Sequence, residues 1–246
     1  MNVLQLKNLT VKNKKKIILK KINLYARTGD IIAIIGANGV GKSSLLKAIM
    51  KHFSYKITNG SLSYNNKKIN NFSTYDMAKL GFYYLDQNPI GIEGIKLIDL
   101  YRTIYQNCHQ KIEMVDFYKK VMLELKQFNL KPDILNLDNT MLSGGQSKKN
   151  ELIQLDLINP HVIMLDEIDS GCDVDFIKII AKYVNKIKVN KIIFLVSHQQ
   201  KLFNLIKPNK FILLHNNTIV ETGKNEKINK ILNLGFEKYL KNNDDQ

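Results

Sequence analysis

A phosphate-binding loop is the strongest chemical signal in this chain, since the pattern G-x-x-x-x-G-K-[ST] is met by Gly36-Ala37-Asn38-Gly39-Val40-Gly41-Lys42-Ser43. Glycines let such a backbone wrap round a phosphate chain, and its amides, with the N-terminus of the following helix, supply partial positive charge. Lys42 is expected to reach the β- and γ-phosphates, and the Ser43 hydroxyl to hold Mg²⁺. The alternative is a simple turn with a solvated lysine. It is disfavoured because an apolar run precedes the loop and a helical pattern follows it.

Further residues that could do chemistry follow the loop in order. Gln87 ends a predicted strand, and a second potential phosphate-binding helix N-terminus is formed by Leu142-Ser143-Gly144-Gly145-Gln146. Asp166 and Glu167 end an apolar run, and His198 ends the next one. Carboxylates and histidines are the groups that bind metal ions and move protons. Taken alone, these residues would be two solvated acids and a structural histidine. Because they occur in the same chain as the phosphate loop, a catalytic role is favoured.

The pattern of the whole chain predicts an α/β fold with a mostly parallel sheet that positions these groups. Paired alternating strands come first, and a helix that ends near Phe53 follows the phosphate loop. After an inserted helical stretch, strands and helices alternate. The expected strands are residues 4–11, 17–25, 31–35, 61–64, 82–85, 162–165, 192–196, 211–214 and 218–221, and the expected helices are 73–80, 95–106, 112–128, 142–159, 173–188 and 199–206.

We expect one domain over residues 1–246. Within it, residues 1–87 and 142–246 form a catalytic core with an antiparallel β subdomain near the N-terminus. Residues 88–141 form a helical subdomain, because alternating strand patterns vanish there and Pro132 breaks the second of its helices.

The formal charge of +15 suggests a nucleic-acid partner, but the kind of basic residue argues against one. The excess comes from lysines spread along the chain, and arginine, which suits bidentate contacts, occurs only at Arg27 and Arg102.

No apolar stretch approaches the ~20 residues that span a bilayer, and the first residues resemble a strand and no targeting segment. Cys108 and Cys172 stand far apart, which favours a reducing compartment and no autonomous metal site.

In this order the motifs resemble those of the ATP-binding cassette (ABC) ATPases, a type of P-loop NTPase, over essentially the whole chain. Walker A is residues 36–43, the Q-loop holds Gln87, the signature is residues 142–146, Walker B ends at Asp166 and Glu167, the D-loop is residues 170–173 and the H-loop holds His198. The resemblance implies that ATP and Mg²⁺ are bound, with Ser44 and Gln87 joining the phosphate loop around ATP. Mg²⁺ would be held by Ser43, by Gln87 and, through water, by Asp166. Many transport cassettes stack an aromatic ring on adenine, and residues 11–14 offer none, so the preference for a base stays open.

The same resemblance assigns the catalytic roles. Glu167 would be the general base for the attacking water, and His198 would contact the γ-phosphate, as would Lys42. Ser143, Gly144 and Gly145 of one copy would close with Gln146 over ATP held by another copy. Because each motif occurs once, the active state would be a head-to-tail dimer with two composite sites.

The sequence around the motifs resembles that of the SufC family, the ATPases of the SUF iron–sulfur cluster assembly machinery. The residues concerned are LSGGQSKKNE at 142–151, DEIDSG at 166–171, QNPIGIEG at 87–94 and VSHQQ at 196–200. Transport cassettes usually follow Walker B with Pro-Thr or Pro-Ser. The resemblance implies that SufB- and SufD-like scaffold proteins dock on Gln87 and the helical subdomain, and that ATP-driven closure remodels them. It implies a soluble protein of a bacterial cytoplasm or of a plastid or apicoplast stroma.

Two other functions stay open. The chain could be the ATP-binding subunit of a transporter that imports metals or small solutes, and stimulation of ATP hydrolysis by a membrane permease, not by a soluble scaffold, would reveal this. A module that holds ATP without hydrolysing it is disfavoured by the presence of both Glu167 and His198.

Overall fold

The computed structural model describes residues 1–87, 91–108 and 113–244, which fall into two compact units. Residues 1–84 and 161–246 form the core unit, and residues 85–160 form the helical unit. The helical unit therefore extends beyond the expected helical subdomain of residues 88–141 at both ends. Its C-terminal extension contains α5 (Gly144–Ile158), which packs on α3 (Leu97–Cys108) of the same unit. Residues 88–90 of the resemblance to SufC, and Ile112 of an expected helix, lie outside the described residues.

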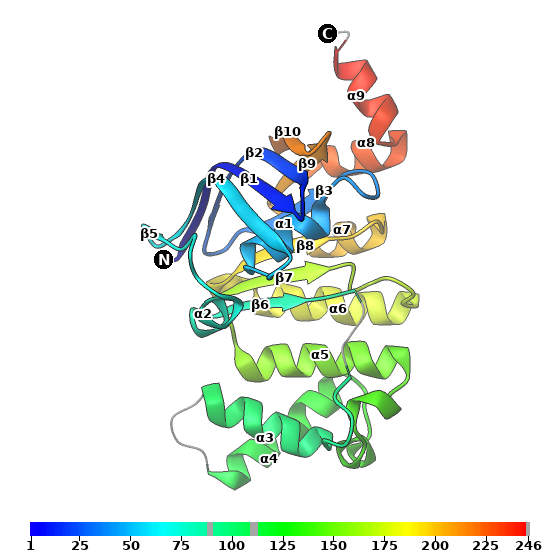
Figure 1. Ribbon diagram of the computed structural model, residues 1–246. Coiled ribbons are helices and arrows are strands. Elements are labelled where there is room, and N and C mark those ends of the chain that lie inside the picture. The colour runs from blue at the N-terminus through cyan, green and yellow to red at the C-terminus, as the bar shows by residue number, and fades with distance from the viewer. Residues whose placement is uncertain (88–90, 109–112, 245–246) are drawn as a thin grey trace. The chain divides into compact units, whose positions relative to one another are not determined.

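The core unit contains two sheets (Figure 1). In the first, the strand order is β2-β1-β4-β5 and the described pairs are antiparallel. In the second, the order is β10-β9-β3-β8-β7-β6, with β3, β7, β8 and β9 in parallel register and β10 antiparallel to β9. The expectation of a mostly parallel sheet is confirmed. The strands are β1 (Val3–Asn13), β2 (Lys16–Arg27), β3 (Ile31–Ile35), β4 (Tyr55–Tyr64), β5 (Lys67–Lys68), β6 (Phe82–Leu85), β7 (Val162–Asp166), β8 (Ile192–Val196), β9 (Lys210–His215) and β10 (Thr218–Gly223).

The central strands are apolar on both faces, which is why they lie inside the sheet. Every residue of β3, β7 and β8 is buried. Parallel strands end at the same edge of a sheet, so the loops after these three strands are neighbours. The phosphate loop, the Asp166-Glu167 pair and His198 are therefore placed at one edge.

A hydrophobic core joins the first sheet, α1 (Lys42–Ile49) and one face of the second sheet. In β1 the buried residues are Leu4 and Leu6, then Leu9 and Val11, so the alternation is interrupted by one residue. Asn8 there has a left-handed φ of 48° and the pairing with β2 shifts register, as in a β-bulge. The bulge keeps both apolar pairs on the core side.

Helices cover the second sheet, and two expectations about helices need correction. The first helix ends at Ile49 and not near Phe53, because Lys51 adopts a left-handed φ of 60° and Phe53 lies exposed. Two C-terminal helices were not expected; each is short, with few buried residues. The remaining helices of the core unit are α2 (Thr74–Lys79), α6 (Val174–Ile187), a 3₁₀ turn (Lys188–Asn190), α7 (Gln200–Ile206), α8 (Glu226–Leu234) and α9 (Phe236–Asp244).

The helical unit is built from α3, α4 (Met114–Gln127) and α5, with 3₁₀ turns at Pro132–Asn136 and Asn139–Met141. A chain of buried and half-buried polar side chains runs through its interior. The Tyr101 hydroxyl donates to Asn150 Oδ1 at 2.6 Å, and Asn150 Nδ2 donates to Asn139 Oδ1 at 2.6 Å. Burial raises the pKa of Tyr101, so this hydroxyl stays a donor at neutral pH. In the part of the chain that is described, no helix has the length and apolar character needed to cross a bilayer.

Candidate nucleotide-binding and catalytic site

The phosphate loop connects the end of β3 to α1 and is shaped by its glycines. A Cβ on Gly36 would lie 2.5 Å from the backbone oxygen of Leu214, so no larger residue fits against β9 at this point. Gly41 is the N-cap of α1 with a φ of 109°, a left-handed conformation that favours glycine. The first turn of α1 has no acidic residue and its cap makes no side-chain hydrogen bond. No side chain of the first turn or of the cap therefore satisfies these amides, which suits them to bind phosphate oxygens.

Lys42 is nearly buried beneath the loop, with 5% of its surface exposed. Its Nζ donates to the backbone oxygens of Gly36 and Ala37 at 3.0 and 3.1 Å. Burial lowers the pKa of Lys42, and the negative charges of Glu167 and Asp166 oppose that shift. The ammonium is thus held under the loop by two uncharged carbonyl oxygens. Negatively charged phosphate oxygens would replace these acceptors favourably.

Ser43 and Asp166 meet where α1 begins and β7 ends. Ser43 Oγ donates to Asp166 Oδ1 at 3.0 Å, and the Tyr84 hydroxyl donates to Asp166 Oδ2 at 2.7 Å. A hydroxyl and a nearly buried carboxylate are hard oxygen donors, which is the donor type that Mg²⁺ prefers. Among the described residues, no group of three or more histidine, cysteine or acidic side chains could hold a metal. Such a pair suits Mg²⁺ that takes its other ligands from phosphates and water.

Glu167 and His198 contact each other at the ends of β7 and β8. His198 Nε2 lies 3.3 Å from Glu167 Oε1, and both side chains are partly exposed. Glu167 has a left-handed φ of 51°, unusual for a residue with a side chain, and its N–H donates to Val196 O at 3.0 Å. The turn after β7 thereby aims the carboxylate at the histidine on the neighbouring strand end.

Sequence patterns did not reveal a second pair of groups that joins these two loops. Asp169, with 2% of its surface exposed, accepts a hydrogen bond from Ser197 Oγ at 2.6 Å. Gln199 Nε2 donates to the backbone oxygen of Asp169 at 2.8 Å. This link fixes the loop that carries Glu167 against the loop that carries His198. Asp169 and Tyr84 were missed because their role depends on neighbouring strands and shows in no local pattern.

The other predicted phosphate-loop residues lie at the surface of the same loop. Ala37, Asn38 and Gly39 are exposed and Val40 is half-buried. Ser44 Oγ donates to the Tyr55 hydroxyl at 3.4 Å. The structure thus brings together the whole loop, Asp166, Glu167 and His198.

Gln87 and the signature segment belong to the helical unit and stay predictions. Gln87 is exposed, two residues after the end of β6. At the start of α5, Ser143 Oγ accepts from the Gln146 N–H at 3.4 Å, and Gln146 Oε1 accepts from the Ser143 N–H at 2.9 Å. This capping box satisfies two groups at the helix end while Gly144 and Gly145 remain exposed.

A family model described as "ABC transporter" matches residues 19–170 of this chain. A "Probable ATP-dependent transporter ycf16" from the alga Antithamnion is 34% identical, with 96% of each chain covered. The "Iron-sulfur cluster assembly protein SufC" of Plasmodium berghei is 32% identical, over 92% of this chain and 64% of that protein. In a solved structure titled as the dimeric structure of a bacterial ABC transporter cassette, the fold matches with a TM-score of 0.76 and 22% identity, over 91% of this chain and 99% of that one.

Proposed function

This chain belongs to the ABC transporter family of ATPases, and we propose that it hydrolyses Mg-ATP as a closed pair of copies that drives a scaffold of iron–sulfur cluster assembly. ATP hydrolysis follows from the family. The dimer, the scaffold and the role of each residue are the proposal. The observation that carries it is the contact between Glu167 and His198 at the strand end next to the Ser43–Asp166 pair.

The site residues of the core unit have separate roles in phosphoryl transfer to water. The amides of the phosphate loop and Lys42 bind the β- and γ-phosphates, exchanging the carbonyl oxygens of Gly36 and Ala37 for phosphate oxygens. Ser43 and, through water, Asp166 would hold Mg²⁺, which would supply neutralisation of the charge on the phosphates. Tyr84 keeps Asp166 oriented.

Glu167 accepts the proton of the attacking water, and His198 orients that carboxylate and the γ-phosphate. The hydrogen bond between Ser197 and Asp169 holds the ends of β7 and β8 together. It thereby fixes the position of Glu167 relative to His198. Positioning of this kind, more than covalent chemistry, accelerates phosphoryl transfer.

A second copy would supply the missing contacts to ATP. The phosphate loop and the signature each occur once in the chain, and Ser143, Gly144 and Gly145 are exposed at the start of α5. The structural neighbour that is titled a dimer supports the same arrangement. Closure of two copies excludes water and completes the set of donors around the γ-phosphate.

Substitution of the base tests the site and the dimer together. Glu167→Gln should reduce kcat by at least about a hundredfold, the usual loss for a general base, and should accumulate a dimer on addition of Mg-ATP. Glu226→Gln, an exposed carboxylate on α8, is the matched control and should hydrolyse ATP normally. Light scattering that shows only monomer for Glu167→Gln at saturating Mg-ATP would contradict the dimer.

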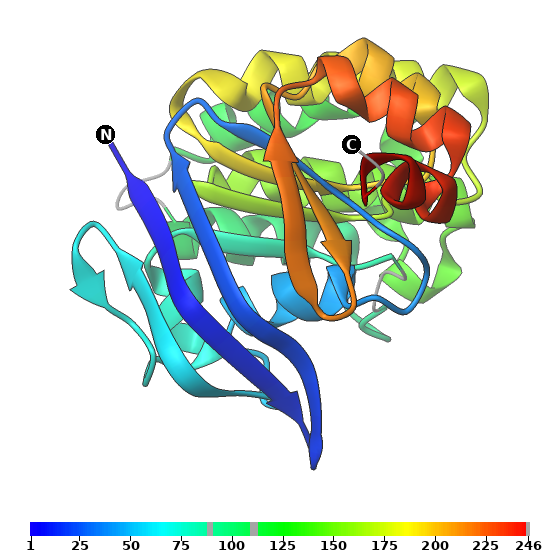
Figure 2. The ribbon, with the colours of Figure 1, turned by 90° about the horizontal axis from the view of Figure 1, so that it is seen from above.

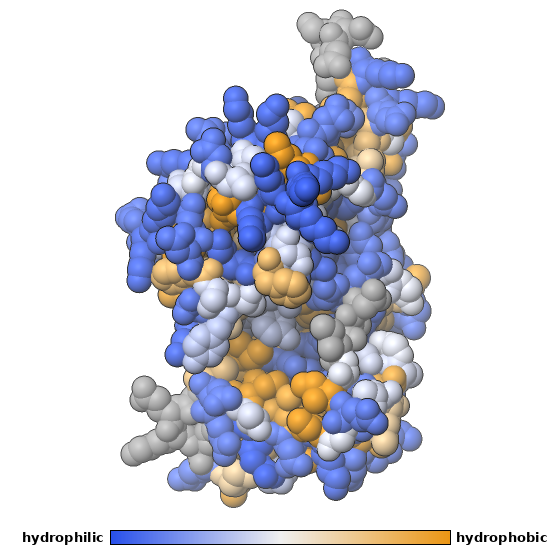
Figure 3. All heavy atoms as spheres, viewed as in Figure 1, coloured by the Kyte–Doolittle hydropathy of each residue, from blue (hydrophilic) through white to orange (hydrophobic). Residues whose placement is uncertain are grey.

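The scaffold is inferred from the relatives and from the surface. A relative named for iron–sulfur cluster assembly matches 92% of this chain. Apolar side chains gather on the visible face of the helical unit (Figure 3). The large apolar residues exposed on this unit include Ile92, Ile95, Val115, Leu123 and Met141. A gathering of apolar side chains on the surface, as in Figure 3, supports a partner protein that docks on the helical unit. One relative, from Arabidopsis thaliana, is named chloroplastic and another comes from Bacillus subtilis, which supports a plastid stroma or a bacterial cytoplasm as the compartment.

The ATP-binding subunit of a transporter is the second candidate, because the Antithamnion relative is named a probable ATP-dependent transporter. Purified chain should hydrolyse ATP faster with soluble SufB- and SufD-like scaffold. Acceleration by a membrane permease alone would favour the transporter.

A further inference from the structure

A cleft of about 790 Å³ opens in the core unit between its two sheets. It is lined by β1 and β2 on one side and by β9, β10 and Lys224 on the other, with Ile32 of β3 at the base. No residue of the candidate ATP site contributes to its lining. Its volume lies within the range of small-molecule sites, so it is large enough for an organic ligand.

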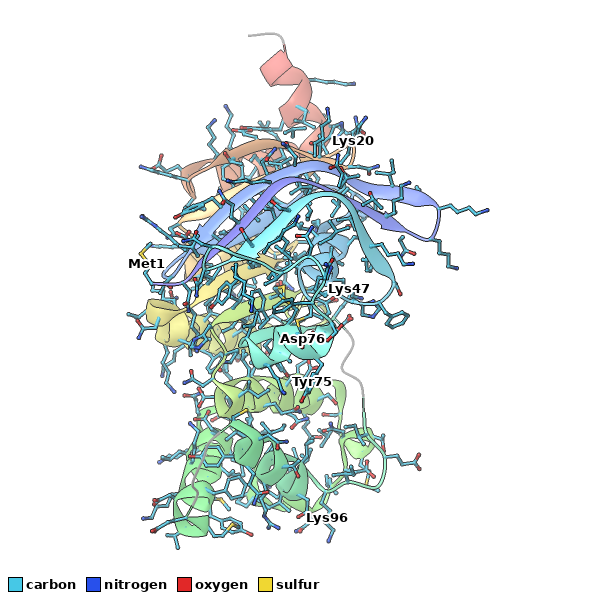
Figure 4. The ribbon with its side chains drawn as sticks, turned by 60° about the vertical axis from the view of Figure 1, so that its left-hand side comes forward. Met1, Lys20, Lys47, Tyr75, Asp76 and Lys96 are labelled. Atoms are coloured by element: carbon cyan, nitrogen blue, oxygen red, sulfur yellow. The ribbon has the colours of Figure 1, made fainter. Side chains whose placement is uncertain are left out.

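The cleft exists because two edge strands meet at one end and separate at the other. The Lys20 N–H of β2 donates to the backbone oxygen of Asn217, in the turn before β10, at 2.8 Å. Toward their carboxyl ends β2 and β10 diverge (Figure 2), and the residues that line the cleft, from Asn23 on β2 and Thr222 on β10 onward, lie at that end. Lys20, labelled in Figure 4, is not among the residues that line this cleft.

The base and lower walls of the cleft are apolar. Leu6, Leu24, Ile32 and Phe211 line it, and each is buried by its neighbours in the two sheets. Gly223 leaves room for the Phe211 ring, since a Cβ on this glycine would lie 2.7 Å from Phe211 Cε1. Tyr25, which also lines the cleft, is 49% exposed, so a hydrocarbon or aromatic body in the cleft would leave water by packing on its ring.

The rim of the cleft is positively charged, and no acidic residue of the described chain lines it. Lys210 is paired with the nearly buried Asp30, Nζ to Oδ2 at 2.6 Å, so its charge is neutralised. Lys7 and Lys224 are exposed on opposite walls, and in the described part of the chain neither ammonium has a carboxylate partner. An anionic group placed between them would be attracted by both.

From this combination we propose that the cleft binds a small amphipathic anion, a carboxylate with a hydrophobic body of medium length. The body lies against the Tyr25 ring, above the buried apolar base, and the carboxylate lies between Lys7 and Lys224. Extended polypeptide along the free edges of β2 or β10 is the competing occupant, and the test below separates the two.

Calorimetric titration of the full chain with decanoate, in the absence of nucleotide, tests the proposal independently of ATP hydrolysis. Decanoate should bind, decanol more weakly, and acetate not measurably. The variant Lys7→Ala with Lys224→Ala should weaken decanoate binding by about tenfold and leave decanol binding unchanged. Lys20→Ala removes a lysine of β2 outside the cleft and should change nothing.

A filled cleft gives a second, independent measurement. Thr222→Trp places a large ring at an exposed lining position and should abolish decanoate binding, whereas Thr218→Trp, on the same strand outside the lining, should not. Equal affinity for decanoate and decanol, binding unaffected by the double lysine variant, or binding only of an acidic extended peptide would each overturn the proposal.

Discussion

Glu151 of the helical unit provides the sharpest quantitative prediction, because this half-buried carboxyl has a strongly raised pKa. Its Oε2 is buried and has no hydrogen-bond partner among the described residues. Burial raises the pKa of Glu151 to about 8, the negative charge of Asp86 adds to the rise, and Lys148 opposes it. At neutral pH the folded chain therefore keeps this side chain protonated.

The consequence for stability follows from the two protonation states. The carboxyl has an ordinary pKa of 4.5 in the unfolded chain and about 8 in the folded one. As pH rises from 4.5 to 8, ionisation favours the unfolded chain, so the folded state loses stability through this window. At about 1.4 kcal/mol per pH unit the loss is at most about 3 kcal/mol at pH 7 and about 5 kcal/mol at pH 9.

The variant Glu151→Gln keeps the shape and removes the ionisation. Its free energy of unfolding by urea, followed by circular dichroism, should equal that of the parent at pH 4.5 and exceed it by about 3 kcal/mol at pH 7. Glu113→Gln, at an exposed carboxylate before α4, should show no such difference. A gap between Glu151→Gln and parent that stays constant from pH 4.5 to 9 would refute the reasoning.

Two further substitutions test packing. Gly36→Ala should lower stability by about 1–3 kcal/mol and abolish ATP binding, since its Cβ would clash with the Leu214 backbone, whereas Gly144→Ala, whose Cβ would meet no atom within 4 Å, should leave urea stability unchanged. Tyr101→Phe should cost about 1–3 kcal/mol in urea denaturation, because it leaves the buried oxygen of Asn150 without its 2.6 Å hydrogen bond; an unchanged midpoint would show that water replaces the hydroxyl.

Much of this protein could be predicted from local patterns. The phosphate loop between an apolar strand and a helix, the alternating strands and the acidic end of β7 are properties of short segments, in which side-chain period and turn residues decide the conformation. The end of α1 was misplaced because Lys51 adopts a left-handed conformation. Glycine usually occupies such a position, and a lysine there gives no signal in the sequence. The short helices α8 and α9 were missed because each buries little apolar surface of its own.

Contacts between distant segments were decided by the tertiary structure alone. The parallel sheet sets the ends of β7 and β8 side by side, and only there do Glu167 and His198 come within 3.3 Å and Asp169 bond to Ser197. The cleft between β2 and β10 depends on the angle at which two sheets separate. Residue type and spacing thus determine which chemistry the chain carries. Strand order and sheet packing determine which groups meet, because those distances are set by long-range burial and no local pattern records them.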